Sequence, residues 1–142
     1  MLSKKHLRIK DSTIPNAGKG LFAMDSTKPD DAVLFPKNST IIGYKGELIT
    51  NEQLTARYGE LTAPYAIKVG KDHVIDAGCN RSVGSMVNHP PQGTRPNVRF
   101  STNPITRTAK LIAVSPIRNG QELFVSYGPA YRFDEGAIIY TK

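Results

Sequence analysis

The chain has 142 residues, of which 39% are apolar and 22% charged, and this is the size and composition of one ordinary globular domain. Its 12 glycines and 10 prolines imply many turns, which favours a mainly β architecture over a helical bundle. Neither a secretory leader nor a membrane-spanning apolar run is present, and the one cysteine, Cys79, excludes an internal disulfide and a cysteine-rich zinc site, so we expect an intracellular protein without a metal.

The first half of the chain predicts short strands and a single helix. Strands are expected at residues 7–10, 21–23 and 40–48, with a turn through residues 14–20 between the first two. Thr50-Asn51-Glu52-Gln53 has the form of a capping box, in which Thr50 caps the helix and Gln53 reaches back to it. A helix from there to about Tyr58 would end at Gly59, a residue type that is common just after a helix.

The second half predicts two hairpins and a last short strand. The first hairpin pairs residues 65–69 with 73–76, the second pairs 97–101 with 105–114, and the last strand runs from 122 to 127. No internal repeat and no linker divides the sequence. We therefore expect one domain over residues 1–142, with its core at about 6–133 and a C-terminal tail at 134–142.

The net charge of +7 is unevenly distributed along the chain. Between Ala77 and Phe133 there is one acidic residue, Glu122, against seven basic ones: Arg81, Arg95, Arg99, Arg107, Lys110, Arg118 and Arg132. A positive field of this kind favours polyanions, so contact with nucleic acid or with a nucleosome is one explanation. A basic, solvated surface without such a partner explains the same residues equally well.

No familiar hydrolase or metal pattern is present. The three histidines, His6, His73 and His89, are far apart and lack the spacing of a metal site on one helix. Gly18-Lys19-Gly20 lacks the further residues of a dinucleotide or phosphate loop, so by itself it indicates a tight turn. Asn88-His89 alone is better explained as a loop asparagine beside a surface histidine.

Four short motifs nevertheless follow one another in an order that has a known counterpart. They are Gly18-Lys19-Gly20-Leu21-Phe22-Ala23, Tyr44-Lys45-Gly46-Glu47-Leu48-Ile49, Asn88-His89 with Pro96-Asn97, and Gly120-Gln121-Glu122-Leu123-Phe124-Val125-Ser126-Tyr127-Gly128. In type, order and spacing these motifs resemble the SET-domain protein-lysine methyltransferase family. The resemblance runs from about His6 to Phe133.

The resemblance implies both a fold and a cofactor. The fold would be mainly β, with short β-sheets around a C-terminal pseudoknot and one or two short helices, and the last strand would pass under the Asn88-His89 loop. S-adenosylmethionine would be the methyl donor, and no metal would be bound. The cofactor site would comprise Gly18, Lys19, Gly20, Leu21, Asn88, His89 and Tyr127, since glycine suits a turn whose backbone must approach a ligand closely.

The resemblance also makes Tyr127 the catalytic residue, standing between the cofactor and the substrate amine. A free lysine has a pKa of about 10.4, so a narrow apolar channel beside the positive sulfonium would favour the neutral amine that attacks the methyl group. The channel would be lined by Tyr65, Phe100, Val125, Tyr131 and Phe133. Because neither Phe100 nor Val125 brings a hydroxyl that would crowd the amine, we expect di- or trimethylation; Phe100 as an ordinary core residue is the alternative.

The sequence departs from the family's pattern in three places. Ser85-Met86-Val87 stands where Arg-Phe-x is usual, and residues 90–95 lengthen the loop between His89 and Pro96-Asn97. Cysteines for the zinc module that often follows the tyrosine are absent. We therefore expect a small stand-alone member whose channel is closed by Tyr131, Phe133 and the tail at 134–142.

The resemblance implies a lysine in a protein as the substrate. A histone tail is the family-level expectation, and a nuclear or chromatin-associated location would follow from it. The contrasting hypothesis is a non-catalytic SET-like or other small β module that uses a basic face on nucleic acid or a nucleosome. The presence of Asn88, His89 and Tyr127 together favours catalysis.

Overall fold

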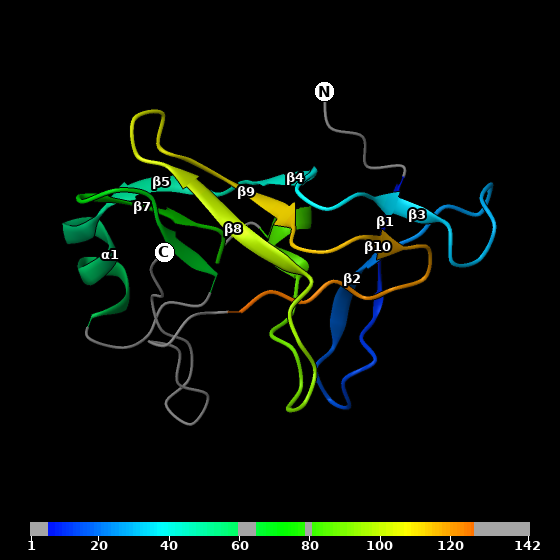
Figure 1. Ribbon diagram of the computed structural model, residues 1–142. Coiled ribbons are helices and arrows are strands. Elements are labelled where there is room, and N and C mark those ends of the chain that lie inside the picture. The colour runs from blue at the N-terminus through cyan, green and yellow to red at the C-terminus, as the bar shows by residue number, and fades with distance from the viewer. Residues whose placement is uncertain (1–5, 60–64, 79–80, 127–142) are drawn as a thin grey trace.

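Ten short strands form four small antiparallel sheets in residues 6–59, 65–78 and 81–126, the residues that the computed structural model describes (Figure 1). The strands are β1 (Leu7–Asp11), β2 (Lys19–Ala23), β3 (Val33–Phe35), β4 (Thr40–Tyr44), β5 (Glu47–Thr50), β6 (Ala66–Lys68), β7 (His73–Asp76), β8 (Val98–Asn103), β9 (Thr108–Ala113) and β10 (Ile117–Arg118). β1 pairs with β2 and β3 with β10, while the two larger sheets have the orders β4-β9-β8 and β5-β7-β6. The expected mainly β fold of short sheets is confirmed.

The α-helix α1 (Asn51–Tyr58) begins and ends where the capping signals predict. The Gln53 N–H donates to the Thr50 hydroxyl at 3.1 Å, and the Thr50 N–H donates to the Gln53 side chain at 2.8 Å. The helix packs onto the β5-β7-β6 sheet through a small second core of Ile49, Leu54, Ala66 and Val74. Neither α1 nor any other helix of the described residues is long and apolar enough to cross a membrane.

The prediction of one strand over residues 40–48 is wrong, because this stretch forms two strands that belong to different sheets. β4 pairs with β9, whereas β5 pairs with β7. The chain crosses between the sheets at Gly46, where a Cβ atom would lie 2.7 Å from the Asp76 carbonyl oxygen and 2.9 Å from the Ala77 nitrogen. Only glycine tolerates such a close approach of another backbone. The position of the break between β4 and β5 therefore depends on a tertiary contact and not on the strand propensity of the residues.

Both predicted hairpins are present, with altered ends. Tyr65 lies before β6 with a positive φ of 64°, outside the strand that was expected to include it. In β8–β9 the turn occupies residues 104–107, part of which the prediction placed in the second strand. The Asn103 side chain accepts hydrogen bonds from the Ile105 and Thr106 N–H groups at 2.9 and 3.2 Å. Because these N–H groups bond within the turn, they do not pair with a neighbouring strand, and β9 begins only at Thr108.

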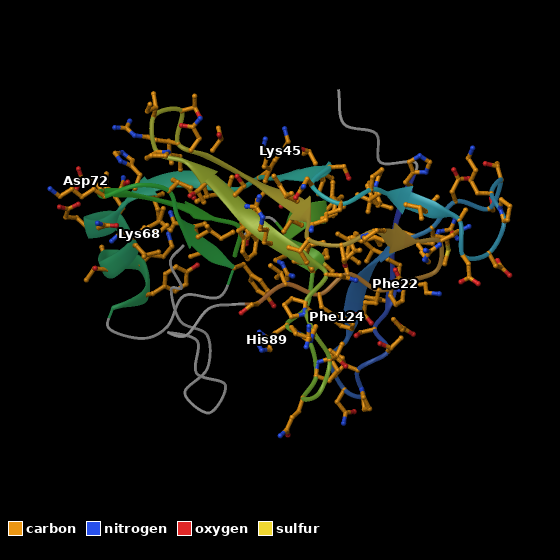
Figure 2. All side chains as sticks on the ribbon, viewed as in Figure 1. Phe22, Lys45, Lys68, Asp72, His89 and Phe124 are labelled. Atoms are coloured by element: carbon orange, nitrogen blue, oxygen red, sulfur yellow. The ribbon has the colours of Figure 1, made fainter. Side chains whose placement is uncertain are left out.

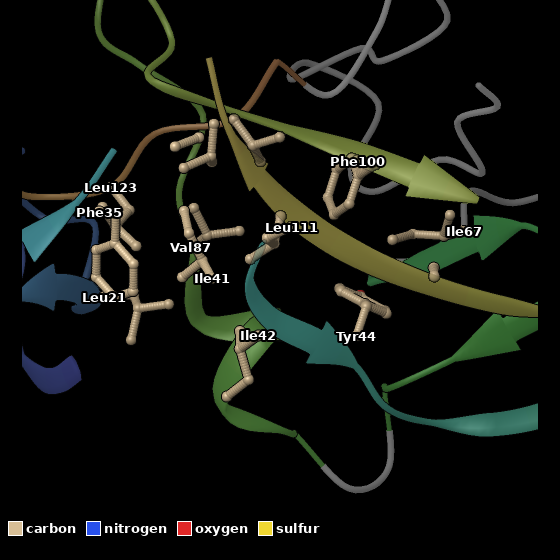
Figure 3. Close-up of a cluster of buried hydrophobic side chains, with 14 of the residues drawn as sticks. Leu21, Phe35, Ile41, Ile42, Tyr44, Ile67, Val87, Phe100, Leu111 and Leu123 are labelled. Carbon is tan, nitrogen blue, oxygen red and sulfur yellow. The ribbon is translucent and has the colours of Figure 1, made fainter. Parts of the chain in front are cut away.

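The main core lies between the β4-β9-β8 sheet, β2 and the last described segment of the chain (Figure 3). Its large, fully buried side chains include Leu21, Ile41, Ile67, Phe100, Leu111, Ile117 and Leu123. Burying a side chain of this size contributes roughly 1.5–3 kcal/mol. Because Leu21 comes from β2 and Leu123 from the last segment, the same apolar cluster fastens the N-terminal hairpin and the C-terminal segment together.

Candidate active site

The last described segment, residues 120–126, lies between two parts of the chain that are distant in sequence. On one side the Leu123 N–H donates to the Leu21 carbonyl at 2.7 Å, so the segment runs along β2. On the other side the Val125 N–H donates to the Asn88 carbonyl at 2.9 Å. The segment changes partner from residue to residue, so isolated bridges replace the regular strand predicted from residue 122 onwards.

Asn97 holds the middle of this segment with its side chain. Its Nδ2 donates to the Glu122 carbonyl at 3.0 Å, and its Oδ1 accepts from the Phe124 N–H at 2.8 Å. The Asn97 backbone N–H donates to the Phe124 carbonyl at 3.0 Å. One asparagine therefore supplies the hydrogen bonds that a neighbouring strand would otherwise provide, which gives Pro96-Asn97 a structural reason to be part of the motif.

The carboxylate of Glu122 joins the segments that carry the predicted cofactor residues. It accepts hydrogen bonds from the Ser12 hydroxyl at 2.7 Å, the Thr13 N–H at 2.8 Å and the Thr13 hydroxyl at 2.6 Å, all in the turn between β1 and β2. Asn88 Nδ2 donates to the same carboxylate at 3.2 Å and to the Lys19 carbonyl at 3.1 Å. One buried side chain thus fixes the glycine-containing turn, the Asn88 segment and the last segment relative to one another.

Glu122 is 6% exposed, and its hydrogen-bond donors are neutral groups. Burial acts to raise the pKa of this carboxyl, but the hydrogen bonds from Thr13, Ser12 and Asn88 outweigh it and lower the pKa below its usual value. The carboxylate is therefore ionised at neutral pH. A lowered folded-state pKa means that its stabilising contribution is present at neutral pH and is lost in acid, as the pH falls through that pKa.

The two glycines of the Gly18-Lys19-Gly20 turn have different surroundings. A Cβ atom on Gly20 would collide with Glu122 Oε2 and would lie 3.1 Å from Asn88 Nδ2. A Cβ atom on Gly18 would meet no described atom within 4 Å, and Gly18 has a φ of +74°. Gly20 therefore lets the network approach the backbone, whereas Gly18 turns the chain and leaves its backbone open on one side.

Asn88 and His89 follow the 3-10 helix η2 (Val83–Met86), and Figure 2 shows His89 at the lower side of the domain near Phe124. The Asn88 side chain bonds the described residues through its Nδ2, which donates to the Lys19 carbonyl and to Glu122. Burial lowers the pKa of His89, which keeps its ring neutral at pH 7. In the part of the chain that the structure describes, no group of three or more His, Cys, Asp or Glu side chains is placed to hold a metal ion.

Tyr65, Tyr44 and Phe100 form a second group of contacting residues. The Tyr44 hydroxyl donates to the Tyr65 carbonyl at 2.6 Å, and the Tyr44 and Phe100 rings meet edge to face with their centroids 5.6 Å apart. The Arg81 guanidinium carbon lies over the Tyr65 ring, 3.3 Å from its centroid. Tyr44 thus connects Tyr65 and Phe100, two predicted channel residues that come from different hairpins.

The structure brings half of the twelve predicted site residues into these two groups. Lys19, Gly20 and Asn88 share the Glu122 network, and Val125, 1% exposed, is bonded to Asn88. The side chain of Leu21 is buried in the core, so only its backbone faces this network. Tyr127, Tyr131, Phe133 and the tail at 134–142 lie outside the described residues, and their roles stay predictions.

Glu122 and Tyr44 are central to this arrangement, yet neither is among the site residues predicted from the sequence. Glu122 did carry a signal, since it is the one acidic residue between Ala77 and Phe133 and is followed directly by apolar residues. An acid in such a place indicates a buried carboxylate with specific donors. Tyr44 carries no comparable signal in the sequence, because a tyrosine in a strand is common.

Comparison with known proteins identifies relatives of this chain. The family model for the SET domain matches residues 18–128. Two curated proteins, from Mus musculus and Homo sapiens, are both named histone-lysine N-methyltransferase, H3 lysine-36 specific. Each is 33% identical to this chain over 96 residues, a match that covers 64% of this chain and 4% of the relative, so the chain spans a small part of their length.

Two solved structures share the fold. One is ctPRC2 in complex with H3K27me3 and H3K27M, with a TM-score of 0.73 and 22% identity, covering 98% of this chain and 17% of that one. The other is ctPRC2 in an autoinhibited conformation bound to S-adenosylmethionine, with a TM-score of 0.69 and 24% identity, covering 89% of this chain and 15% of that one. At these identities the likeness concerns the fold, and it agrees with the expected arrangement of short sheets.

Proposed function

The chain belongs to the SET-domain family, and on that premise we propose that it transfers methyl groups from S-adenosylmethionine to a lysine side chain of a protein. The observation that carries the proposal is the hydrogen-bond network of Glu122. This network fastens together the Gly18-Lys19-Gly20 turn, Asn88 and the segment that leads to Tyr127, and these are the parts to which the family resemblance assigns the cofactor.

The described residues fit S-adenosylmethionine, which supplies an electrophilic methyl group on a positive sulfonium when it is bound. The open backbone at Gly18 allows close approach, and the Asn88 side chain is held beside the same turn by its bond to the Lys19 carbonyl. The lowered pKa of His89 keeps that ring from adding a positive charge beside the sulfonium. The proposed cofactor residues are Gly18, Lys19, Gly20, Leu21, Asn88, His89 and Tyr127.

The substrate lysine must lose its proton before it can attack. We assign its channel to Tyr65, Phe100 and Val125, completed by Tyr131 and Phe133. Burial among apolar side chains disfavours the ammonium form of the lysine, and the positive sulfonium adds like-charge repulsion. The Tyr127 hydroxyl would then orient the neutral amine, so most of the rate gain comes from positioning and electrostatics.

Cofactor binding and methyl transfer test the proposal directly. Calorimetric titration of the purified chain with S-adenosylmethionine is expected to show one site. A panel of histone and non-histone lysine peptides, read by mass spectrometry, is expected to show a gain of methyl groups on lysine. Absence of cofactor binding contradicts the proposal, whereas binding without transfer to any protein or peptide would favour the non-catalytic module.

A histone is the proposed substrate, because both curated relatives are named as histone H3 enzymes. A nuclear or chromatin-associated location follows from that substrate. The chain would act as one domain over residues 1–142, with its core at about 6–133 and the tail at 134–142 closing the channel. Peptides of intact and lysine-to-arginine histone sequence distinguish this proposal from activity on other proteins.

The number of methyl groups added is expected to depend on Phe100, which is 1% exposed and carries no hydroxyl. We propose that the unmodified enzyme proceeds to di- or trimethyl-lysine. Phe100→Tyr should shift the product towards monomethyl-lysine by about 1 kcal/mol, the scale of one net hydrogen bond. A time course on a lysine peptide, read by mass spectrometry, measures this shift.

The matched control for that variant is Phe35→Tyr. Phe35 is also buried, at 6% exposed, but its ring contacts His6, and Figure 3 shows it at the opposite end of the cluster from Phe100. It adds the same hydroxyl to the core without approaching the channel, so its product distribution should stay unchanged. A wild-type enzyme that stops at one methyl group would contradict the role given to Phe100.

A further inference from the structure

The outer face of the β4-β9-β8 sheet has a different character from its inner face. Residues directly opposite each other in an antiparallel pair point to the same side of a sheet. The pairs Arg99–Ile112, Ser101–Lys110 and Asn103–Thr108 therefore share one face. Phe100 and Leu111, the pair between them, point to the other side, into the core.

This outer face is basic. Arg99 and Lys110 are exposed on it, and exposed Lys45 and Arg107 flank it just after β4 and in the β8–β9 turn. We call these four residues the basic sheet face. No acidic residue occurs in β4, β8 or β9, and among the described residues none of the four forms an ion pair.

Ile112, opposite Arg99, is apolar and buried, whereas the other side chains between these cations are small and polar. Gly43 lies opposite Lys110 on the β4 side and Ser101 lies opposite it on the β8 side. Thr108 and Asn103 form the next pair. The cations are thus surrounded by hydroxyl, amide and backbone groups. In protein–DNA complexes such groups bind phosphate oxygens together with lysine and arginine.

We propose that the basic sheet face binds the phosphate backbone of double-helical DNA. Positive charge without interspersed acids is complementary to a polyanion, and releasing counterions from DNA drives such binding. Single-stranded nucleic acid is usually held by exposed aromatic side chains on which bases stack. The aromatic residues of these strands, Tyr44 and Phe100, are both buried, which favours a duplex over a single strand.

The basic sheet face extends towards the candidate active site at its Arg99 end. Figure 2 shows Lys45 at the upper side of the domain, whereas His89 and Phe124 lie at the lower side. Arg99 follows Val98, which forms a bridge with Val125 in the last described segment. The inference does not depend on methyl transfer, because the contacts are made by the sheet alone.

Fluorescence anisotropy of a labelled 20-base-pair duplex, titrated with the full chain between 50 and 200 mM salt, tests the proposal. Four phosphate contacts predict a slope of log affinity against log salt of about −3 to −4, since each contributes about −0.9. The double variant Arg99→Gln, Lys110→Gln should make this slope less steep by about 2 and weaken binding. The exposed pair Arg8→Gln, Lys28→Gln, on β1 and in the loop between β2 and β3, is the charge-matched control and should change the slope little.

Three outcomes would overturn the proposal. Absence of duplex binding at 50 mM salt removes it, and equal losses in the test and control variants would show that net charge alone is responsible. Tighter binding to the single strand, or displacement of the duplex by an equal charge of polyglutamate, would assign the face to another partner. Circular dichroism on each variant confirms that the comparison is made between folded chains.

Discussion

Tyr127→Phe is expected to lower methyl transfer about a hundredfold while the chain stays folded. The substitution removes one hydroxyl and little volume, and a hydrogen bond made in the transition state of a desolvated site is worth a factor of this size, about 2.7 kcal/mol. The N–H of Val125, two residues before Tyr127, donates to the Asn88 carbonyl at 2.9 Å, so the chain leading to Tyr127 is attached to the proposed cofactor segment. Single-turnover transfer to a lysine peptide, with calorimetric cofactor affinity measured alongside, gives the result.

The control for this variant is Tyr58→Phe. The Tyr58 hydroxyl donates to Asp76 Oδ2 at 2.9 Å at the end of α1, so the same atom is removed from a hydrogen bond outside the Glu122 network. Its transfer rate should stay close to that of the unmodified chain. Near-normal turnover in Tyr127→Phe would mean that the catalytic residue lies elsewhere.

Gly20→Ala is expected to weaken S-adenosylmethionine binding at least tenfold and to lower the free energy of unfolding by about 1–3 kcal/mol, the range for forcing a methyl group into a packed interior. The added Cβ would collide with Glu122 Oε2 and press against Asn88 Nδ2 at 3.1 Å. Moving the carboxylate would disturb its hydrogen bonds to Ser12 and Thr13 as well. The Gly18-Lys19-Gly20 turn and the Asn88 segment would then no longer be held at fixed positions relative to each other.

Gly43→Ala provides the matched comparison. A Cβ atom on Gly43 would have the Ala109 carbonyl oxygen at 4.0 Å as its nearest neighbour, which is ordinary contact. This variant should keep both its cofactor affinity and its thermal midpoint. If Gly20→Ala binds S-adenosylmethionine as tightly as Gly43→Ala does, the Glu122 network has no part in holding the cofactor.

Local signals in the sequence were sufficient for the elements whose structure is local. The capping box at Thr50 predicted the start of α1 and Gly59 its end, because the hydrogen bonds that cap a helix join residues three or four positions apart. Strand alternation and turn residues likewise predicted the hairpins β6–β7 and β8–β9. The order of the four motifs predicted the family, which the match over residues 18–128 confirms.

The same local reasoning failed where distant contacts decide the structure. The break between β4 and β5 at Gly46 depends on the backbone of Asp76 and Ala77, thirty residues further along the chain. β3 and β10, with three and two residues, are too short to show any periodicity and form because they pair with each other. The segment after Gly120 resembles a strand in sequence, but its partners change between β2, Asn88 and Asn97.

For the candidate site, the residue types and their order, from Gly18 through Asn88 to Glu122, can be read from the sequence. The folded chain was needed to show that the Glu122 carboxylate joins them, and that Tyr44 connects Tyr65 with Phe100. Separation along the chain explains the difference: Ser12 and Glu122 are 110 positions apart, and no pattern of neighbouring residues encodes a hydrogen bond across that distance. Such a bond forms only because the shared core of Leu21 and Leu123 brings the two ends of the domain together.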